Sequence, residues 1–170
     1  MILHATAQDI PALVALINSA YRGDGAKQGW TTEADLIQGL RTDVEDLTEV
    51  FSEPGTTFLK FCDESSGTII GCVRLQKKDN RLYLGMLTVS PVVQANGIGK
   101  QMLRKAEEVA KEQNCRAIFM TVLSVRTELV AWYERHGYQK TGEVLPFSPN
   151  PKFEITTQQL EFLVLEKPIA

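Results

Sequence analysis

The sequence lacks several features that define other classes of protein. No apolar run approaches the roughly 18 residues that a membrane span requires, and the first residues lack the basic-then-apolar order of a signal peptide. A formal net charge of −3 leaves no basic excess for a nucleic-acid surface. We therefore expect a cytoplasmic protein that binds neither membrane nor nucleic acid.

Cysteine is also scarce. Cys62, Cys72 and Cys115 are odd in number and widely spaced within apolar sequence. This pattern favours buried thiols in a reducing compartment over a disulfide framework or a metal site. At 170 residues and 44% hydrophobic content, the chain is expected to form one domain over residues 1–170 with a sizeable core.

What the sequence contains is a change of periodicity near Pro54-Gly55. Before it, helical spacing of apolar residues predicts helices over 10–21, 32–40 and 42–50, after a short first strand at 1–4. After it, β-branched and apolar runs predict strands. They cover 57–62, 68–76, 81–89, 117–122, 138–143 and 160–165, with helices at 98–114 and 128–136 and a long proline-containing loop at 145–159. The resulting order, β-αα-βββ-α-β-α-ββ, predicts an α/β (α+β) fold with helices on the faces of one sheet.

The segment Gln94-Ala95-Asn96-Gly97-Ile98-Gly99 stands between a strand and an amphipathic helix. Two glycines one residue apart let the backbone approach a ligand closely, and a helix start is a ready anion site. Basic residues precede acidic ones in the helix, which opposes the usual preference and favours an external anion such as phosphate. The segment fails the Walker pattern at Gln94 and Gln101, and the dinucleotide fingerprint at Met102.

The hexapeptide does fit Gln/Arg-x-x-Gly-x-Gly/Ala, and thereby resembles the acetyl-CoA pyrophosphate motif of the Gcn5-related N-acetyltransferase (GNAT) family. Downstream, the stretch from Leu129 to Tyr138 resembles the family's helix-to-strand segment, including its tyrosine at Tyr133. On these two motifs the chain is identified as a member of that family. The resemblance implies a mixed, mostly antiparallel central sheet with helices on both faces, and acetyl-CoA as the cosubstrate.

The resemblance also implies roles for individual residues. In the family the strand before the motif splays from its neighbour, so that its backbone pairs with the pantetheine arm, and a backbone N–H near Leu87 serves as the oxyanion donor. Tyr133 matches the tyrosine that hydrogen-bonds the CoA sulfur, although a core aromatic is the structural alternative at this spacing. The CoA-binding residues implied are Leu87, Val89, Gln94, Asn96, Gly97, Ile98, Gly99 and Lys100.

The acceptor side is expected between residues 21–33 and the loop 145–159. Tyr21, Trp30 and Glu33 are its candidate substrate-binding residues, and Arg22 could bind a substrate carboxylate. No general base stands out among His4, His136, Tyr21, Glu33 and Tyr83. Arg126 departs from the family pattern, because many relatives carry a pantetheine-binding Asn seven residues before the tyrosine. The expected replacement is either a lost contact or an arginine that reaches the CoA phosphates.

These observations predict an acetyl-CoA-dependent N-acetyltransferase that acts on a primary amine of a small molecule or peptide by direct attack. The alternative is a catalytically silent acyl-CoA-binding or sensing module, which would keep the phosphate motif without Tyr133 chemistry. The expected partners are the amine acceptor and a second copy of the chain in a homodimer.

Overall fold

The computed structural model describes residues 1–22, 34–93 and 97–169. A single turn of 3-10 helix, Ala7–Asp9, precedes α1. The helices are α1 (Ile10–Tyr21), α3 (Val44–Ser52), α4 (Ile98–Glu112) and α5 (Thr127–Arg135). The strands are β1 (Ile2–His4), β2 (Ile37–Gln38), β3 (Thr56–Cys62), β4 (Ile69–Lys78), β5 (Arg81–Val89), β6 (Ala117–Leu123), β7 (Gln139–Pro146), β8 (Ile155–Thr156) and β9 (Glu161–Pro168). The strands predicted from β-branched runs are thus confirmed, to within a few residues at each end.

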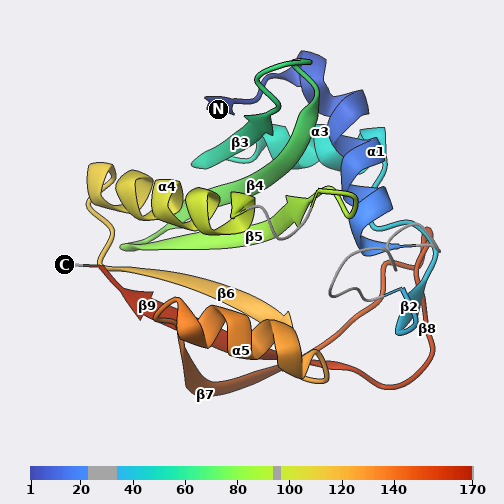
Figure 1. Cartoon of the computed structure of the whole chain (residues 1–170). Helices are drawn as coiled ribbons and strands as arrows, with labels where there is room; N and C mark the ends of the chain where they lie inside the picture. The colour runs from blue at the N-terminus through green and yellow to red at the C-terminus, as the bar shows by residue number, and fades with distance from the viewer. Residues whose placement is uncertain (23–33, 94–96, 170) are drawn as a thin grey trace.

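The main sheet has seven strands in the order β1-β3-β4-β5-β6-β9-β7 (Figure 1). Each neighbouring pair is antiparallel except β5 and β6, which run parallel. The connection between these two strands is α4, because parallel neighbours need a crossover. The expected mixed, mostly antiparallel sheet is confirmed, and its one parallel pair lies at the centre.

Helices cover both faces of this sheet, and strand alternation separates their cores. Leu59 and Val73 point into the cluster that α4 and α5 complete, whereas their neighbours Phe58 and Cys72 point into the cluster under α1 and α3. Successive side chains of a strand face opposite ways, so β3 and β4 supply both cores. This explains why both strands are apolar along most of their length.

The helix expected over 32–40 is wrong where the structure describes it. Residues 34–36 form a turn, and β2 follows as a short strand that pairs with β8 through Ile37↔Thr156. Gly39 has φ of +95°, which a right-handed helix cannot contain. Burial of Ile37 against Leu123 and Leu160 outweighs the local helical spacing. The long loop 145–159 is likewise partly ordered, because β8 lies within it.

The three cysteines are free thiols. Cys72 and Cys115 are buried, and Cys62 is half-buried. No cluster of His, Cys, Asp or Glu within the described ranges could hold a metal ion. Among the same residues, no helix has the length and apolar character to cross a membrane.

Candidate active site

The parallel strands β5 and β6 separate soon after they meet. Their pairing covers Arg81, Leu82 and Tyr83 of β5 and ends there, and the two ribbons diverge toward the N-terminus of α4 in Figure 1. The β4–β5 register shifts between Cys72 and Arg74, and Met86 has φ of +49°. Such a bulge bends its strand. The bulged strand therefore has an edge that faces the gap between the two halves of the sheet.

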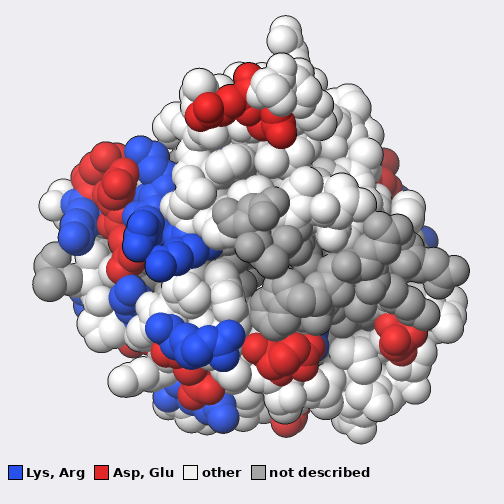
Figure 2. Space-filling model, in the orientation of Figure 1, with Lys and Arg blue, Asp and Glu red and all other residues white. Residues whose placement is uncertain are grey.

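The start of α4 is built to receive a negative charge. Gly97 is its N-cap, with φ of +74°, and the first turn holds no acidic residue. Lys100 and Arg104 are exposed, while Lys105 pairs with Glu108 at 3.1 Å. Figure 2 shows Lys and Arg side chains gathered over this part of the molecule. Unpaired N–H groups and the helix dipole favour an anion at such an end.

Gly99 allows α5 to approach α4 closely. A Cβ atom at this position would lie 3.2 Å and 3.4 Å from two ring atoms of Trp132. The Trp132 ring in turn packs against the ring of His136, with centroids 4.4 Å apart. The two motifs that identified the family therefore meet in space, although they are far apart in sequence.

A cavity of about 320 Å³ lies where these elements converge. Its walls are Leu87–Val89 of β5, residues 97–100 of α4, and side chains of α1 and α5. Leu87, Val89, Gly97, Ile98, Gly99 and Lys100, six of the eight predicted CoA-binding residues, line it. The other two, Gln94 and Asn96, lie outside the described residues.

Tyr133 lies on the inner face of α5 and is only 6% exposed. Burial raises the pKa of its phenol well above the usual value, and nearby Arg126 opposes that rise with its positive charge. Tyr133 belongs to the hydrophobic core and also lines the cavity. The core and functional interpretations of this tyrosine are therefore compatible.

A second cavity, of about 310 Å³, fills the gap between β5 and β6. It extends from Tyr83 to the loop after β7, where Phe147, Ser148 and Glu154 line it. The two cavities share five lining residues: Tyr21, Leu87, Arg126, Leu129 and Tyr133. A ligand group in one cavity would thus meet a ligand group in the other at the bulge of β5.

Tyr21 stands at this junction. Its hydroxyl donates a hydrogen bond of 2.9 Å to the carbonyl of Leu87. Arg126, 7% exposed, borders both cavities from the N-terminus of α5. The structure thus places Arg126 at the junction, where it lines both cavities.

The other predicted residues separate into three groups. Tyr83 and His136 line the second and first cavity respectively. His136 Nδ1 lies 2.7 Å from the carbonyl of Trp132, so that nitrogen carries the proton. His4 is exposed on β1 and lines neither cavity. Trp30 and Glu33 lie outside the described residues.

Arg22 lines the second cavity, but its guanidinium is engaged within the chain. Its guanidinium forms a 2.8 Å ion pair with Glu154 and donates to the carbonyl of Leu40 at 2.9 Å. Its carboxylate partner is thus part of the chain itself. Arg41 also lines the second cavity, although no sequence pattern marked it as a site residue. Neither Glu154 nor Arg41 belongs to a motif, so only their placement in space reveals them.

The family model for the acetyltransferase (GNAT) family matches residues 14–138. Human N-acetyltransferase 8B is 29% identical over 125 residues, which are 69% of this chain and 53% of that protein. Rat N-acetyltransferase 8 is 32% identical over 111 residues, covering 61% of this chain and 49% of the relative. The chain thus spans about half the length of these curated relatives.

Solved structures show the same fold. The ribosomal-protein-S18-alanine N-acetyltransferase of Escherichia coli superposes with a TM-score of 0.74 at 12% identity, covering 100% of this chain and 94% of the other. A GNAT superfamily phosphinothricin acetyltransferase from Sinorhizobium meliloti, solved with acetyl-CoA bound, gives 0.73 at 15% identity and covers 100% and 88%. The chain belongs to the GNAT acetyltransferase family. The acetyl-CoA-bound neighbour shows that this fold can hold acetyl-CoA.

Proposed function

We propose that this chain transfers the acetyl group of acetyl-CoA to a primary amine of a small molecule or peptide by direct attack. The observation that carries the proposal is the meeting of two cavities at Leu87 and Tyr133. One cavity begins at the anion-binding end of α4, and the other opens between β5 and β6. Donor and acceptor would thus approach the same point from different sides, which aligns them for a single-step transfer.

The residues of the first cavity fit acetyl-CoA. The N-terminus of α4, with Gly97, Gly99 and Lys100, suits a pyrophosphate, because its N–H groups and charge favour an anion. Gln94 and Asn96 are also proposed to bind the cosubstrate. The edge of β5 at Leu87 and Val89 suits the amide-containing arm, which can pair with it as an added strand would. When bound, the cosubstrate supplies an acyl group activated as a thioester.

At the junction, the backbone N–H of Leu87 would donate to the thioester oxygen, where negative charge develops. The amine nitrogen forms the new C–N bond, the C–S bond breaks, and the amine gives up one proton to water. The Tyr133 hydroxyl donates a hydrogen bond to the departing sulfur. Full proton transfer from a phenol to a thiolate is uphill by about 2 kcal/mol at ordinary pKa values, and burial raises the pKa of Tyr133 further. We therefore assign Tyr133 a hydrogen-bonding role.

The acceptor would enter the second cavity, and Tyr21, Trp30 and Glu33 remain its proposed contacts. The structural neighbours include one enzyme named for an alanine of a ribosomal protein and one named for the small molecule phosphinothricin. Both kinds of acceptor are therefore reasonable for this fold. A homodimer and a cytoplasmic location complete the proposal, and the free, mostly buried thiols support a reducing compartment.

The test is release of free thiol from acetyl-CoA over a panel of amino acids, polyamines and peptides, with wild type and Tyr133→Phe. We expect Tyr133→Phe to lower kcat at least tenfold and to leave the Kd for CoA within twofold. Tyr138→Phe is a matched control, because the Tyr138 hydroxyl is buried without a partner among the described residues and lines neither cavity. Binding of CoA without turnover of any acceptor would favour the silent module. Equal kcat in both variants would remove Tyr133 from the mechanism.

A further inference from the structure

Arg41 is a cation held at the wall of the second cavity. Its backbone N–H donates to the Oδ1 of Asn18 at 2.7 Å, which fixes the position of the residue. Its guanidinium carbon lies 5.6 Å from the centre of the Tyr21 ring. The side chain is half-buried and lines the cavity. Among the residues that the structure describes, no carboxylate lies within ion-pair distance of it.

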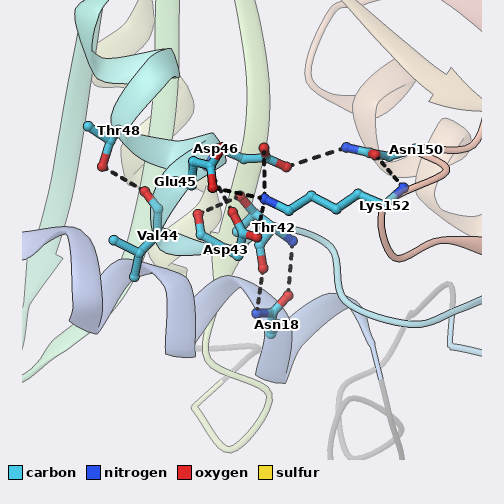
Figure 3. A network of polar contacts seen from close by, with 9 residues as sticks. All are labelled: Asn18, Thr42, Asp43, Val44, Glu45, Asp46, Thr48, Asn150 and Lys152. Atoms are coloured by element: carbon cyan, nitrogen blue, oxygen red, sulfur yellow. Dashed lines mark hydrogen bonds and ion pairs between the residues drawn. The ribbon is translucent and has the colours of Figure 1, made fainter.

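The nearest acidic residues along the chain are engaged elsewhere. Asp43 binds Lys152 at 2.6 Å and accepts from the backbone N–H of Asp46. Glu45 and Asp46 lie 3.6 Å and 3.8 Å from the same lysine. Figure 3 shows the three carboxylates around Lys152. The carboxylates at the N-terminus of α3 therefore pair with Lys152. They do not neutralise Arg41, whose positive charge can act on a ligand in the second cavity.

The carboxylate that does line the cavity is also occupied. One oxygen of Glu154 pairs with Arg22 at 2.8 Å, and the other accepts from the backbone N–H of Asn150 at 2.8 Å. The lining thus contains three arginines and one glutamate, and Arg22 and Glu154 neutralise each other. Arg41 thus adds a positive charge to the described lining, which favours an anionic ligand group.

Apart from its charged residues, the second cavity is lined mostly by residues with apolar or aromatic side chains. Its walls between the diverging strands include Leu84, Met86, Met120, Val122 and Phe162. A ligand that satisfies both parts of the lining has an anionic end near Arg41 and an apolar body between β5 and β6.

The Tyr21 ring sets the distance between charge and reaction point. Its hydroxyl reaches the Leu87 carbonyl at the bulge, while its face lies under the Arg41 guanidinium. One aromatic side chain therefore separates the arginine from the proposed transfer point. An acceptor whose carboxylate stands next to its amine, as in an α-amino acid, fits this short spacing.

We propose that the acceptor is an apolar amino acid or a similar amine that carries a carboxylate, with Arg41 binding the carboxylate. The proposal rests on the proposed acetyl transfer and specifies its substrate class. Arg41 would act on specificity, because it touches the carboxylate and none of the reacting atoms. Charge-assisted hydrogen bonds from a planar guanidinium are well suited to such a group.

The experiment compares phenylalanine, phenylalaninamide and phenethylamine, which share an amine and a ring while only the first has a carboxylate. Leucine and methionine, each with its amide and its decarboxylated amine, form further sets. With wild type we expect the KM of the amino acid to be at least tenfold lower than that of either analogue. In Arg41→Gln we expect the KM for the amino acid to rise about ten- to a hundredfold, as for a lost charge-assisted bond. The KM for the amides would stay within twofold, and Arg41→Lys would recover part of the loss.

The outcomes distinguish a failure of the carboxylate proposal from a failure of the proposed acetyl transfer. Turnover of amides or simple amines as efficiently as amino acids would overturn the carboxylate proposal and leave acetyl transfer intact. An equal rise of KM for all acceptors in Arg41→Gln would do the same. Binding of the amino acids to the CoA-loaded protein is also measured calorimetrically, so the proposal is tested even without turnover. Absence of both binding and turnover for every carboxylate-bearing amine would overturn it.

Discussion

The hydroxyl of Tyr21, at the end of α1, donates a 2.9 Å hydrogen bond to the carbonyl of Leu87, in the bulge of β5. This contact connects α1 to the edge of β5 at the junction of the two cavities. The Leu87 carbonyl therefore points toward α1. Leu87 lies on the part of β5 that no longer pairs with β6. The relationship gives Tyr21 a defined task, which is to hold the bulge in the orientation that the proposed oxyanion donor requires.

Tyr21→Phe should therefore weaken catalysis more than folding. Loss of one partly buried hydrogen bond costs about 1 kcal/mol of stability, while the bulge gains freedom at the transfer point. We expect kcat to fall about three- to tenfold, in keeping with a similar free energy, with the Kd for CoA nearly unchanged. Thiol-release kinetics and urea unfolding measure the two effects. A variant with wild-type kcat would show that the bulge holds its orientation unaided.

Substitution of the two glycines of the phosphate motif by alanine should have different effects. Gly97→Ala strains a residue at φ of +74° with open space around it, which costs roughly 1–2 kcal/mol. Gly99→Ala meets the Trp132 ring instead, and the displaced ring narrows the first cavity. We expect Gly97→Ala to lower stability and Gly99→Ala to raise the Kd for acetyl-CoA several-fold with stability retained. Gly97→Asn, which tolerates positive φ better, serves as the control, and identical effects of the two alanines would contradict this assignment.

The Arg22–Glu154 pair should be a major support of the loop after β7. Both side chains are under 10% exposed, at 4% and 9%. Removal of one partner from a buried pair leaves an uncompensated charge and costs about 3–5 kcal/mol. We expect this loss for Glu154→Gln in urea unfolding, and a partial recovery in the double variant Arg22→Met/Glu154→Leu. Lys152→Met is the control, because its ion pairs are solvent-exposed and should contribute little. A double variant that is less stable than Glu154→Gln would contradict the coupling.

Stability should decline at alkaline pH because three buried groups resist ionisation. Burial raises the pKa of Cys72 to about 12, and it also raises the pKa values of Tyr133 and Tyr138. In the unfolded chain these groups ionise near their ordinary pKa values, about 8.5 for Cys and about 10 for Tyr. The folded state then holds more protons, so the free energy of unfolding falls as pH rises above roughly 9, and more steeply above roughly 10.

Urea unfolding between pH 8 and pH 11 measures this decline. Cys72→Ser, which removes one ionisable thiol, should reduce the part of the slope that begins near pH 9, and the remainder should come from Cys115, whose pKa burial also raises. Below pH 8 these groups should contribute no pH dependence. A free energy of unfolding that stays constant up to pH 11 would refute the linkage.

Local patterns predicted most elements because each is encoded in neighbouring residues. In α4, Met102, Ala106 and Val109 lie on one face and are buried as their spacing indicated. Gly97 has a positive φ and precedes a helix whose first turn holds no acidic residue, both as expected from the immediate sequence. The helix predicted over 32–40 failed because a distant strand, β8, pairs with Ile37.

The candidate site likewise has a part that local sequence predicted and a part that it did not. The sequence by itself determined the phosphate motif, Tyr133 and the helices α4 and α5 on which they lie, because these depend on short-range spacing. Only the tertiary structure decided that Arg22 pairs with Glu154, 132 residues away, and that Arg41 faces the second cavity. Such contacts follow from how the sheet divides between β5 and β6, and no periodicity in the chain records them. The donor side could thus be recognised from sequence, whereas the acceptor side required the fold.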